Sequence, residues 1–169
     1  KYIFHMGNRA AVECSAPEAS VLNGIKFFHV MGCSLMAEKR FANEIIKLMN
    51  GAAEQGGKIS FDPNIRTELL HDQEVFNTVR SVLGKTSVFM PGEEELLLIT
   101  GKRTIEEAVK YCFENPVLEI LALKQGSRGS TVYTRDKVIS MDVYPVAAVD
   151  ATGAGDSFDG AFLCGLLEG

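Results

Sequence analysis

The sequence predicts an α/β fold in which helices cover both faces of a mainly parallel sheet with an antiparallel edge. Three observations support this prediction. Strand-like and helix-like segments alternate along the chain, which is the pattern of parallel strands joined by helices. The strand-like segments are continuous apolar runs, as in strands buried on both faces. The length of 169 residues and the 46% hydrophobic composition suit a single folded domain.

Two strands and a helix are predicted in the first part of the chain. Residues 26–30 form a short apolar run that predicts a buried strand. Apolar residues at helical spacing predict a helix over 35–49, and Asn50-Gly51 supplies its C-terminal stop. Residues 58–61 predict the second strand, which ends at the turn-forming sequence Asp62-Pro63-Asn64.

The same alternation continues through the middle of the chain. Apolar residues at helical spacing predict a helix over 75–83, and the apolar run 86–90 predicts a third strand. Two short helices are expected over 93–100 and 104–114, because the first ends at a glycine and the second before a proline. Residues 118–123 predict a fourth strand.

The last predicted elements are a hairpin and a helix. Segments 130–134 and 137–141 flank Arg135-Asp136, which predicts two antiparallel strands joined by a tight turn. A final helix begins near Ala154.

The two ends of the sequence indicate a piece of a longer chain. Residues 1–4 have the pattern of a strand already under way, and residues 161–169 that of an unfinished helix. We expect residues 1–169 to form one domain core that is incomplete at both ends.

Composition and charge argue against several classes of protein. The net charge is −5 and no Lys/Arg block occurs, which argues against a nucleic-acid binder. No segment is apolar and long enough to span a bilayer. Cys14, Cys33, Cys112 and Cys164 form no C-x-x-C pair, so we expect reduced, mostly buried thiols in a cytoplasmic protein.

The segments that follow the strands are where a ligand would bind, because open α/β sheets bind ligands at the carboxyl ends of their strands. The richest segment is Asp150–Asp156. Its two glycines leave backbone N–H groups bare where a helix begins, and a helix N-terminus attracts anions. Asp156 suits a base that takes a proton from a hydroxyl group as it attacks a phosphorus atom. The alternative is a tight turn followed by an ordinary first-turn acid.

Two common nucleotide-binding motifs are excluded. The pattern G-x-G-x-x-G fails because Phe158 stands at the third glycine position. The P-loop pattern fails because Val79 stands at the upstream glycine position relative to Gly84-Lys85-Thr86.

The longer segment Asp150–Phe162 closely resembles the C-terminal signature of the ribokinase (PfkB) family of carbohydrate kinases. Three other segments resemble motifs of that family in the same order. They are Phe61–Arg66, similar to D-P-N-x-R; Pro91–Leu96, similar to N-x-x-E; and Leu121–Ser130, similar to the nucleotide-side strand and glycine loop. The resemblance covers at least residues 26–169. It implies a ribokinase-like three-layer α/β sandwich, here without the family's lid, and an ATP-dependent sugar kinase.

The resemblance also implies roles for single residues. Asp156 would be the base that deprotonates the sugar hydroxyl. The amides of Gly153, Ala154 and Gly155 would stabilise charge on the transferred γ-phosphoryl group. Glu95 would help to organise Mg²⁺, which commonly keeps several of its waters.

Further family matches lie on the nucleotide and substrate sides. The residues that match the ATP side are Lys124, Gly126, Ser127 and Gly129. Asn64 and Arg66 match positions that face phosphate or substrate, where a planar guanidinium suits a phosphate or a carboxylate.

The substrate class is left open between a sugar acid and a neutral sugar. Lys124, Arg66 and the segment Phe4–Ala11 resemble the 2-keto-3-deoxygluconate kinase branch of the family. That branch usually has an Arg where Met6 stands, to hold the carboxylate of a sugar acid, and Arg9 is out of register. Neutral sugars such as fructose and ribose therefore stay open.

Two positions depart from the family pattern. Gly92 stands where Asn is usual, which affects the metal or phosphate network, and Ala151 stands where Thr is usual. A non-catalytic nucleotide- or sugar-binding module is thus an alternative, although such a module would not need Asp156. A nucleoside kinase of the same family and a homodimer also stay open.

Four other polar residues receive simpler interpretations. His29 lies in an apolar strand and is interpreted as a hydrogen-bonded core histidine. Asp159, one turn beyond Asp156, is interpreted as a surface helix residue. Asp62 is either a turn former or a catalytic group. Cys33 follows a strand, but a nucleophilic cysteine needs a base beside it and the sequence indicates none.

Overall fold

The structure is a computed structural model that describes residues 14–70 and 73–169. Its six strands form one sheet in the order in which they occur along the chain. They are β1 (Phe27–Met31), β2 (Lys58–Asp62), β3 (Val88–Phe89), β4 (Ile120–Lys124), β5 (Ser130–Tyr133) and β6 (Val138–Met141). Neighbouring strands from β1 to β4 are parallel, and β5 and β6 pair antiparallel. The predicted mainly parallel sheet with an antiparallel edge is confirmed, while the strand expected over residues 1–4 lies outside the described residues.

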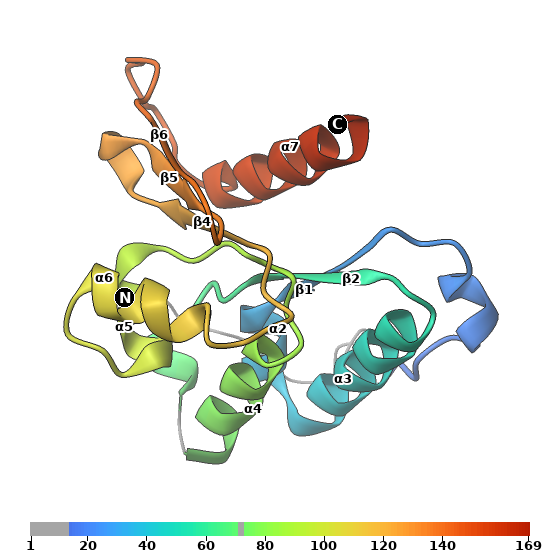
Figure 1. Ribbon diagram of the computed structural model, residues 1–169. Coiled ribbons are helices and arrows are strands. Elements are labelled where there is room, and N and C mark those ends of the chain that lie inside the picture. The colour runs from blue at the N-terminus through green and yellow to red at the C-terminus, as the bar shows by residue number, and fades with distance from the viewer. Residues whose placement is uncertain (1–13, 71–72) are drawn as a thin grey trace.

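Helices lie on both faces of this sheet, as the sequence predicts (Figure 1). The helical elements are η1 (Ala19–Leu22), α2 (Gly32–Ala37), α3 (Lys39–Glu54), η2 (Thr67–Leu69), α4 (Gln73–Leu83), α5 (Glu93–Thr100), α6 (Ile105–Cys112), η3 (Gly126–Arg128) and α7 (Ala154–Glu168). Residues of α2 to α6 form the larger core on one face, where Phe61 and Phe89 stack with their ring centroids 5.6 Å apart. On the other face, the aromatic residues Phe158 and Phe162 of α7 pack against Val88 and Ala122.

The helix predicted over 35–49 is wrong at both of its boundaries. The helix is interrupted at Glu38, whose extended backbone separates α2 from α3. The Glu38 carboxylate accepts a hydrogen bond from the Phe41 N–H at 3.0 Å. This N-cap starts a new helix. At the other end, α3 continues through Gly51 to Glu54, and Gly51 lies close to the Leu22 side chain. Packing against η1 therefore overrides the local stop signal of Asn50-Gly51.

The strand ends that matter for function meet at one edge of the sheet. Asp62 ends β2 beside Met31 of β1, and Lys124 ends β4 beside Gly92. The loops after β1 and β2 touch so closely that a Cβ atom on Gly32 would lie 2.0 Å from the Pro63 carbonyl oxygen. Only glycine fits there, and the contact holds the Asp62-Pro63-Asn64 turn against the start of α2.

All four cysteines lie among the described residues and none is bonded in a disulfide, but the prediction that most are buried is wrong. Cys112 is buried and Cys33 half-buried, whereas Cys14 and Cys164 are exposed. Exposure of Cys164 follows from α7, which packs on the sheet along one side only. Across the ranges 14–70 and 73–169, every helix is too short or too polar to cross a bilayer.

Candidate active site

A polar cavity of about 570 Å³ lies at the carboxyl ends of β2 and β4, where the start of α7 meets the sheet. It is lined by Asp62, Asn64, Arg66, Glu95, Lys124, Asp150, Ala151, Thr152, Gly153, Gly155 and Asp156. Seven of the residues to which the family resemblance assigns roles are thus brought together, although they span residues 64 to 156. The grouping follows from the parallel sheet, which gathers the ends of its strands.

The turn after β2 is fixed by its own polar groups. The Asn64 N–H donates to the Asp62 carboxylate at 3.2 Å, which is an Asx turn. Asn64 has a φ of +38°, in the left-handed region that asparagine tolerates better than most residues. Its side-chain amide donates to the Met31 sulfur at 3.0 Å. Asp62 is therefore a turn former, and the turn directs Arg66 to the polar cavity.

Glu95 joins two of the loops that surround the cavity. One carboxylate oxygen accepts from the Gly92 N–H and the other from the Ile65 N–H, each at 2.7 Å. The first bond caps the N-terminus of α5, where Gly92 is the N-cap residue and offers no side chain for the purpose. Each oxygen retains a lone pair, so the carboxylate can accept one more hydrogen bond on each side.

The start of α7 carries backbone N–H groups toward the same cavity. Gly153 is the N-cap with a φ of +78°, and the preceding loop is closed by a hydrogen bond from the Thr152 N–H to Asp150 at 2.8 Å. That bond lowers the pKa of Asp150 below its usual range. The Ala154 N–H donates to the Ala151 carbonyl at 3.1 Å. The N–H groups of Gly155 and Asp156 follow in the first turn, where a helix has no preceding carbonyl to offer.

Lys124 lies beneath this turn with its ammonium between two acids. Its Nζ is 2.8 Å from Asp62 Oδ2 and 3.4 Å from Asp159 Oδ1, and the three side chains form what we call the Asp62–Lys124–Asp159 cluster. The interpretation of Asp159 as a surface residue is wrong, because it is only 2% exposed. Burial and the neighbouring Asp62 raise the pKa of Asp159 to about 7. A Cβ atom on Gly155 would lie 3.8 Å from Lys124 Nζ, so the ammonium adds positive charge next to the first turn of α7.

A second cavity of about 560 Å³ lies on the other side of the same turn. It is lined by Lys124, Gly126, Gly129, Ser130, Met141, Asp142, Val143, Tyr144, Ala154, Gly155 and Phe158. This cavity is more apolar than the first, and the two share Lys124 and Gly155. Of the residues matched to the nucleotide side, Ser127 is exposed in η3 and lines neither cavity, whereas its neighbour Ser130 lines the second.

Several functional candidates were not identified from the sequence. Asp159 lies three residues after Asp156 and next to Phe158, a spacing that places it near the sheet-facing side of a helix. Its lysine partner is 35 residues away, so this spacing, which an exposed acid can share, is the only local sign of its burial. Ser130 and the residues 141–144 line the second cavity without any pattern that marks them.

The remaining candidates have structural roles or fall outside the description. His29 is half-buried with its Nδ1 3.0 Å from Ser60 Oγ, as expected of a hydrogen-bonded core histidine, and burial lowers its pKa. Burial raises the pKa of the Cys33 thiol, which disfavours a nucleophilic thiolate. Met6 and the segment 4–11 lie outside the described residues. No three His, Cys, Asp or Glu side chains gather as a ready metal-ligand set within residues 14–70 and 73–169.

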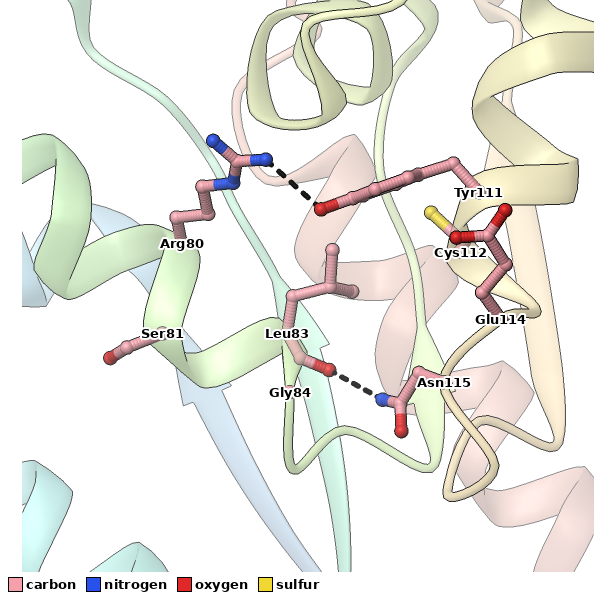
Figure 2. A pocket seen from close by; sticks show the side chains of 8 residues that line it. All are labelled: Arg80, Ser81, Leu83, Gly84, Tyr111, Cys112, Glu114 and Asn115. Carbon is pink, nitrogen blue, oxygen red and sulfur yellow. Dashed lines mark hydrogen bonds between the residues drawn. The ribbon is translucent and has the colours of Figure 1, made fainter.

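A third hollow, of about 290 Å³, lies between α4 and α6 and contains none of the residues predicted from the sequence (Figure 2). Two hydrogen bonds cross it. Arg80 donates to the Tyr111 hydroxyl at 3.0 Å, and the Asn115 amide donates to the Leu83 carbonyl at 3.0 Å. These bonds link α4 to α6 and to the segment after it, and the hollow shares no lining residue with the polar cavity at the sheet edge.

Comparison with known proteins shows what the chain is similar to. Residues 4–169 match the model of the pfkB family carbohydrate kinase. The chain is 35% identical over 150 residues to "Probable fructokinase-4" of Arabidopsis thaliana and 31% identical over 172 residues to fructokinase-1 of Zea mays. These alignments cover 88% and 99% of this chain but 45% and 53% of the relatives. The chain therefore spans about half the length of the curated relatives it matches.

Solved structures with a similar fold include proteins named ribokinase and fructokinase. A protein from E. coli named ribokinase II, in complex with ATP and Mg²⁺, is 35% identical with a TM-score of 0.91, over 99% of this chain and 55% of that one. The fructokinase of Vibrio cholerae O395, in its fructose, ADP and calcium ion bound form, is 28% identical with a TM-score of 0.75. That alignment covers 88% of this chain and 49% of the other.

Proposed function

Since this chain belongs to the pfkB family of carbohydrate kinases, we propose that it carries the phosphoryl-transfer centre of an ATP-dependent sugar kinase. The observation that carries the proposal is the position of the first turn of α7 between two cavities. One cavity is polar and holds Asp156, and the other is largely apolar and suits the flat base of a nucleotide. A group transferred between two molecules bound in these cavities would pass the Gly153–Gly155 amides.

Asp156 acts in this proposal as the general base. Its side chain is exposed to the polar cavity, where a sugar hydroxyl can approach it. The carboxylate takes the proton from that hydroxyl as the oxygen attacks the γ-phosphorus, and the oxygen–phosphorus bond to the leaving ADP breaks. The proton then resides on Asp156 until solvent removes it.

The first turn of α7 acts as the anion hole. Gly153 opens the turn and lets the N–H groups of Gly155 and Asp156 face the transferred group, with the Ala154 N–H available if its bond to Ala151 is exchanged. The Lys124 ammonium beside Gly155 adds charge stabilisation at the same place. Together these groups stabilise negative charge that grows on the phosphoryl oxygens.

The residues present fit ATP and Mg²⁺. Mg²⁺ is usually bound by one or two carboxylates and by substrate phosphates, and it keeps several waters. Glu95 lines the polar cavity with a free lone pair on each oxygen, so it suits a water-mediated role. When bound, Mg²⁺ neutralises the charge of the phosphates. Gly126 and Gly129 line the apolar cavity on the nucleotide side, and Asn64 faces the phosphates from the turn after β2.

A sugar is the proposed substrate, with a neutral ketose as the first candidate. The curated relatives at 31–36% identity are named fructokinases, which favours fructose. Arg66 supports a second candidate, a sugar acid of the 2-keto-3-deoxygluconate type. Its guanidinium lines the polar cavity and suits a carboxylate, although it suits a phosphate equally well.

The proposal is tested by measuring ATP consumption by the full-length protein with Mg²⁺ and a panel of four acceptors. The panel contains fructose, ribose, 2-keto-3-deoxygluconate and adenosine. Turnover with fructose supports the first candidate, and turnover with the sugar acid alone supports the second. Turnover with adenosine alone makes the protein a nucleoside kinase. ATP binding without turnover on any acceptor contradicts the proposal in favour of a non-catalytic binding module.

A further inference from the structure

The most deeply buried residue of α7 is an acid. Asp159 is 2% exposed, whereas Leu166 and Leu167 of the same helix are 37% and 56% exposed. Burying a carboxyl group is costly unless it is paired or protonated. The hydropathy of the helix thus does not explain why Asp159 rather than a leucine faces the sheet, and the explanation lies in its polar partners.

Those partners connect three separate elements. Lys124 of β4 holds Asp62 of β2 at 2.8 Å and Asp159 of α7 at 3.4 Å, and both acid side chains are 3% exposed. The ammonium itself is 18% exposed, so the cluster is largely removed from water. At 2.8 Å the contact between Lys124 and Asp62 has the length of a strong charged hydrogen bond, and the longer contact with Asp159 joins α7 to this pair. The cluster therefore fixes α7 in relation to the ends of two strands.

The cluster contains two acids and one base, so it is balanced when one acid keeps its proton. Burial and the neighbouring Asp62 together raise the pKa of Asp159 to about 7, against the opposing effect of Lys124. Asp159 Oδ2 is buried with no hydrogen-bond partner among the described residues. The side chains of Asp159 and Asp62 interact directly, which favours a proton held between the two acids. His29 of β1, Cys33 of α2 and Asp156 of α7 are further ionisable groups that interact with this region.

We infer that Asp159 is a positioning residue, which acts through Lys124 and Asp62 to set the rotation of α7 and so the direction in which Asp156 faces the polar cavity. Asp156 and Asp159 are three residues apart and lie on neighbouring positions of one helix face. The inference rests on the proposed function, because it takes Asp156 as the base.

Apolar contacts alone would not hold that direction. Phe158, Phe162 and Leu163 hold α7 on the sheet through contacts with Val88, Met90 and Ala122. Such contacts are non-directional and tolerate small rotations of a helix. A rotation that moves a carboxylate by about 1 Å is enough to cost on the order of 10²-fold in rate.

Two variants of the full-length protein test the inference. Asp159→Asn keeps the shape of the protonated acid, since its amide oxygen can accept from Lys124 and its amide nitrogen can donate to Asp62. Asp159→Leu keeps the apolar contacts of the helix and removes both polar ones. For the Asn variant, we expect kcat within about threefold of wild type, whereas the Leu variant loses about 10- to 100-fold in kcat. The KM for ATP changes by less than about threefold in both variants, because the substitutions affect the placement of Asp156 and not the binding of ATP.

The outcomes separate this inference from the proposed function. If the wild-type protein turns over a sugar and Asp159→Leu keeps wild-type kcat, the inference is overturned while the function stands. An Asn variant as impaired as the Leu variant overturns it too. If the wild-type protein phosphorylates no acceptor, the proposed function fails. Amide hydrogen exchange at Gly155 and Asp156 then tests whether Asp159 positions α7. Faster exchange in the Leu variant than in the Asn variant supports the inference, and equal exchange overturns it.

Discussion

The carboxylate of Glu95 accepts a hydrogen bond from the backbone N–H of Ile65 at 2.7 Å, across 30 residues of sequence. Its second oxygen accepts from the Gly92 N–H at the same distance. One side chain therefore ties the turn after β2 to the first turn of α5. Since Asn64 and Arg66 flank Ile65, the position of both depends on Glu95.

Replacing Glu95 by Ala is expected to lower the free energy of unfolding by about 1–3 kcal/mol, because two partly buried N–H groups lose their acceptors. Glu95→Gln keeps one acceptor oxygen and should lose less. Denaturant-induced unfolding at fixed pH measures both changes.

Glu94 provides the control, since it lies exposed in the same helical turn. Glu94→Ala should cost about 0.3–1 kcal/mol through the helix dipole alone. A loss no larger for Glu95→Ala than for this control would mean that the two hydrogen bonds of Glu95 do not stabilise the fold.

Two glycines of the β4–β5 connection should respond differently to alanine. Gly129 has a φ of +88°, and a Cβ atom there would lie 2.0 Å from the Met141 carbonyl oxygen. Gly126 has a φ of +59°, and a Cβ atom there would meet nothing within 4 Å. We expect Gly126→Ala to cost about 1–2 kcal/mol from its left-handed backbone alone.

Gly129→Ala must in addition push β6 away from the turn, so its loss of unfolding free energy should exceed that of Gly126→Ala. It should also weaken ATP binding, because Met141 and Gly129 both line the apolar cavity. Denaturant unfolding and titration with ATP measure the two effects. Equal losses in both variants would contradict the close contact between Gly129 and β6.

The sheet and most of the site could be predicted from sequence because their signals are local. The apolar run before Asp62 and the turn residues after it mark a strand end, and a parallel sheet then brings that end near Lys124. The glycine-rich start of α7 is likewise contained within a few residues. These local patterns predict both the strand or helix and its position in the fold.

Features that depend on distant contacts could not be predicted in the same way. The continuation of α3 past Gly51 depends on its packing with Leu22 of another element. The burial of Asp159 depends on Lys124, 35 residues away in sequence. A spacing of three residues from Asp156 is the only local trace of that contact, and it fits an exposed acid equally well.

Asp156→Asn is expected to lower kcat by on the order of 10²–10⁴-fold, the range of a lost general base. The amide keeps the shape of the side chain and leaves the N–H groups of the turn in place. ATP should therefore bind with a Kd within about threefold of the wild-type value, because the loss falls on the transition state. Steady-state kinetics and ATP titration measure the two quantities.

Asp136→Asn is the matched control for that variant, since Asp136 lies exposed in the turn between β5 and β6. It removes the same charge far from the polar cavity and should leave kcat unchanged. Near-normal turnover of Asp156→Asn would rule out its assignment as the base. A parallel loss in both variants would point to net charge rather than to a catalytic group.

The raised pKa of Asp159 predicts a specific pH dependence of stability. Asp159 titrates near its usual value of 3.8 in the unfolded chain and at about 7 in the folded one. Between these values the folded state binds the extra proton, so stability falls as pH rises and becomes independent of this group above about pH 7. Asp159→Asn removes the titration. The Tm of this variant relative to wild type should therefore rise from pH 4 to pH 7 and then level off, as measured by thermal unfolding across this range.

Glu168→Gln provides the matched control, because Glu168 lies exposed at the end of the same helix. It changes the charge of α7 by the same amount outside the cluster. Its Tm relative to wild type should lack the rise between pH 4 and pH 7 that Asp159→Asn has. Lys124→Met should enlarge the effect, since Asp159 then loses the ammonium that opposes the rise of its pKa. The pKa of Asp159 should rise further, and the pH at which stability levels off should move above the wild-type value. A Tm profile of Asp159→Asn parallel to wild type at every pH would mean that Asp159 is ionised in the folded protein and that the cluster carries its charge without a shared proton.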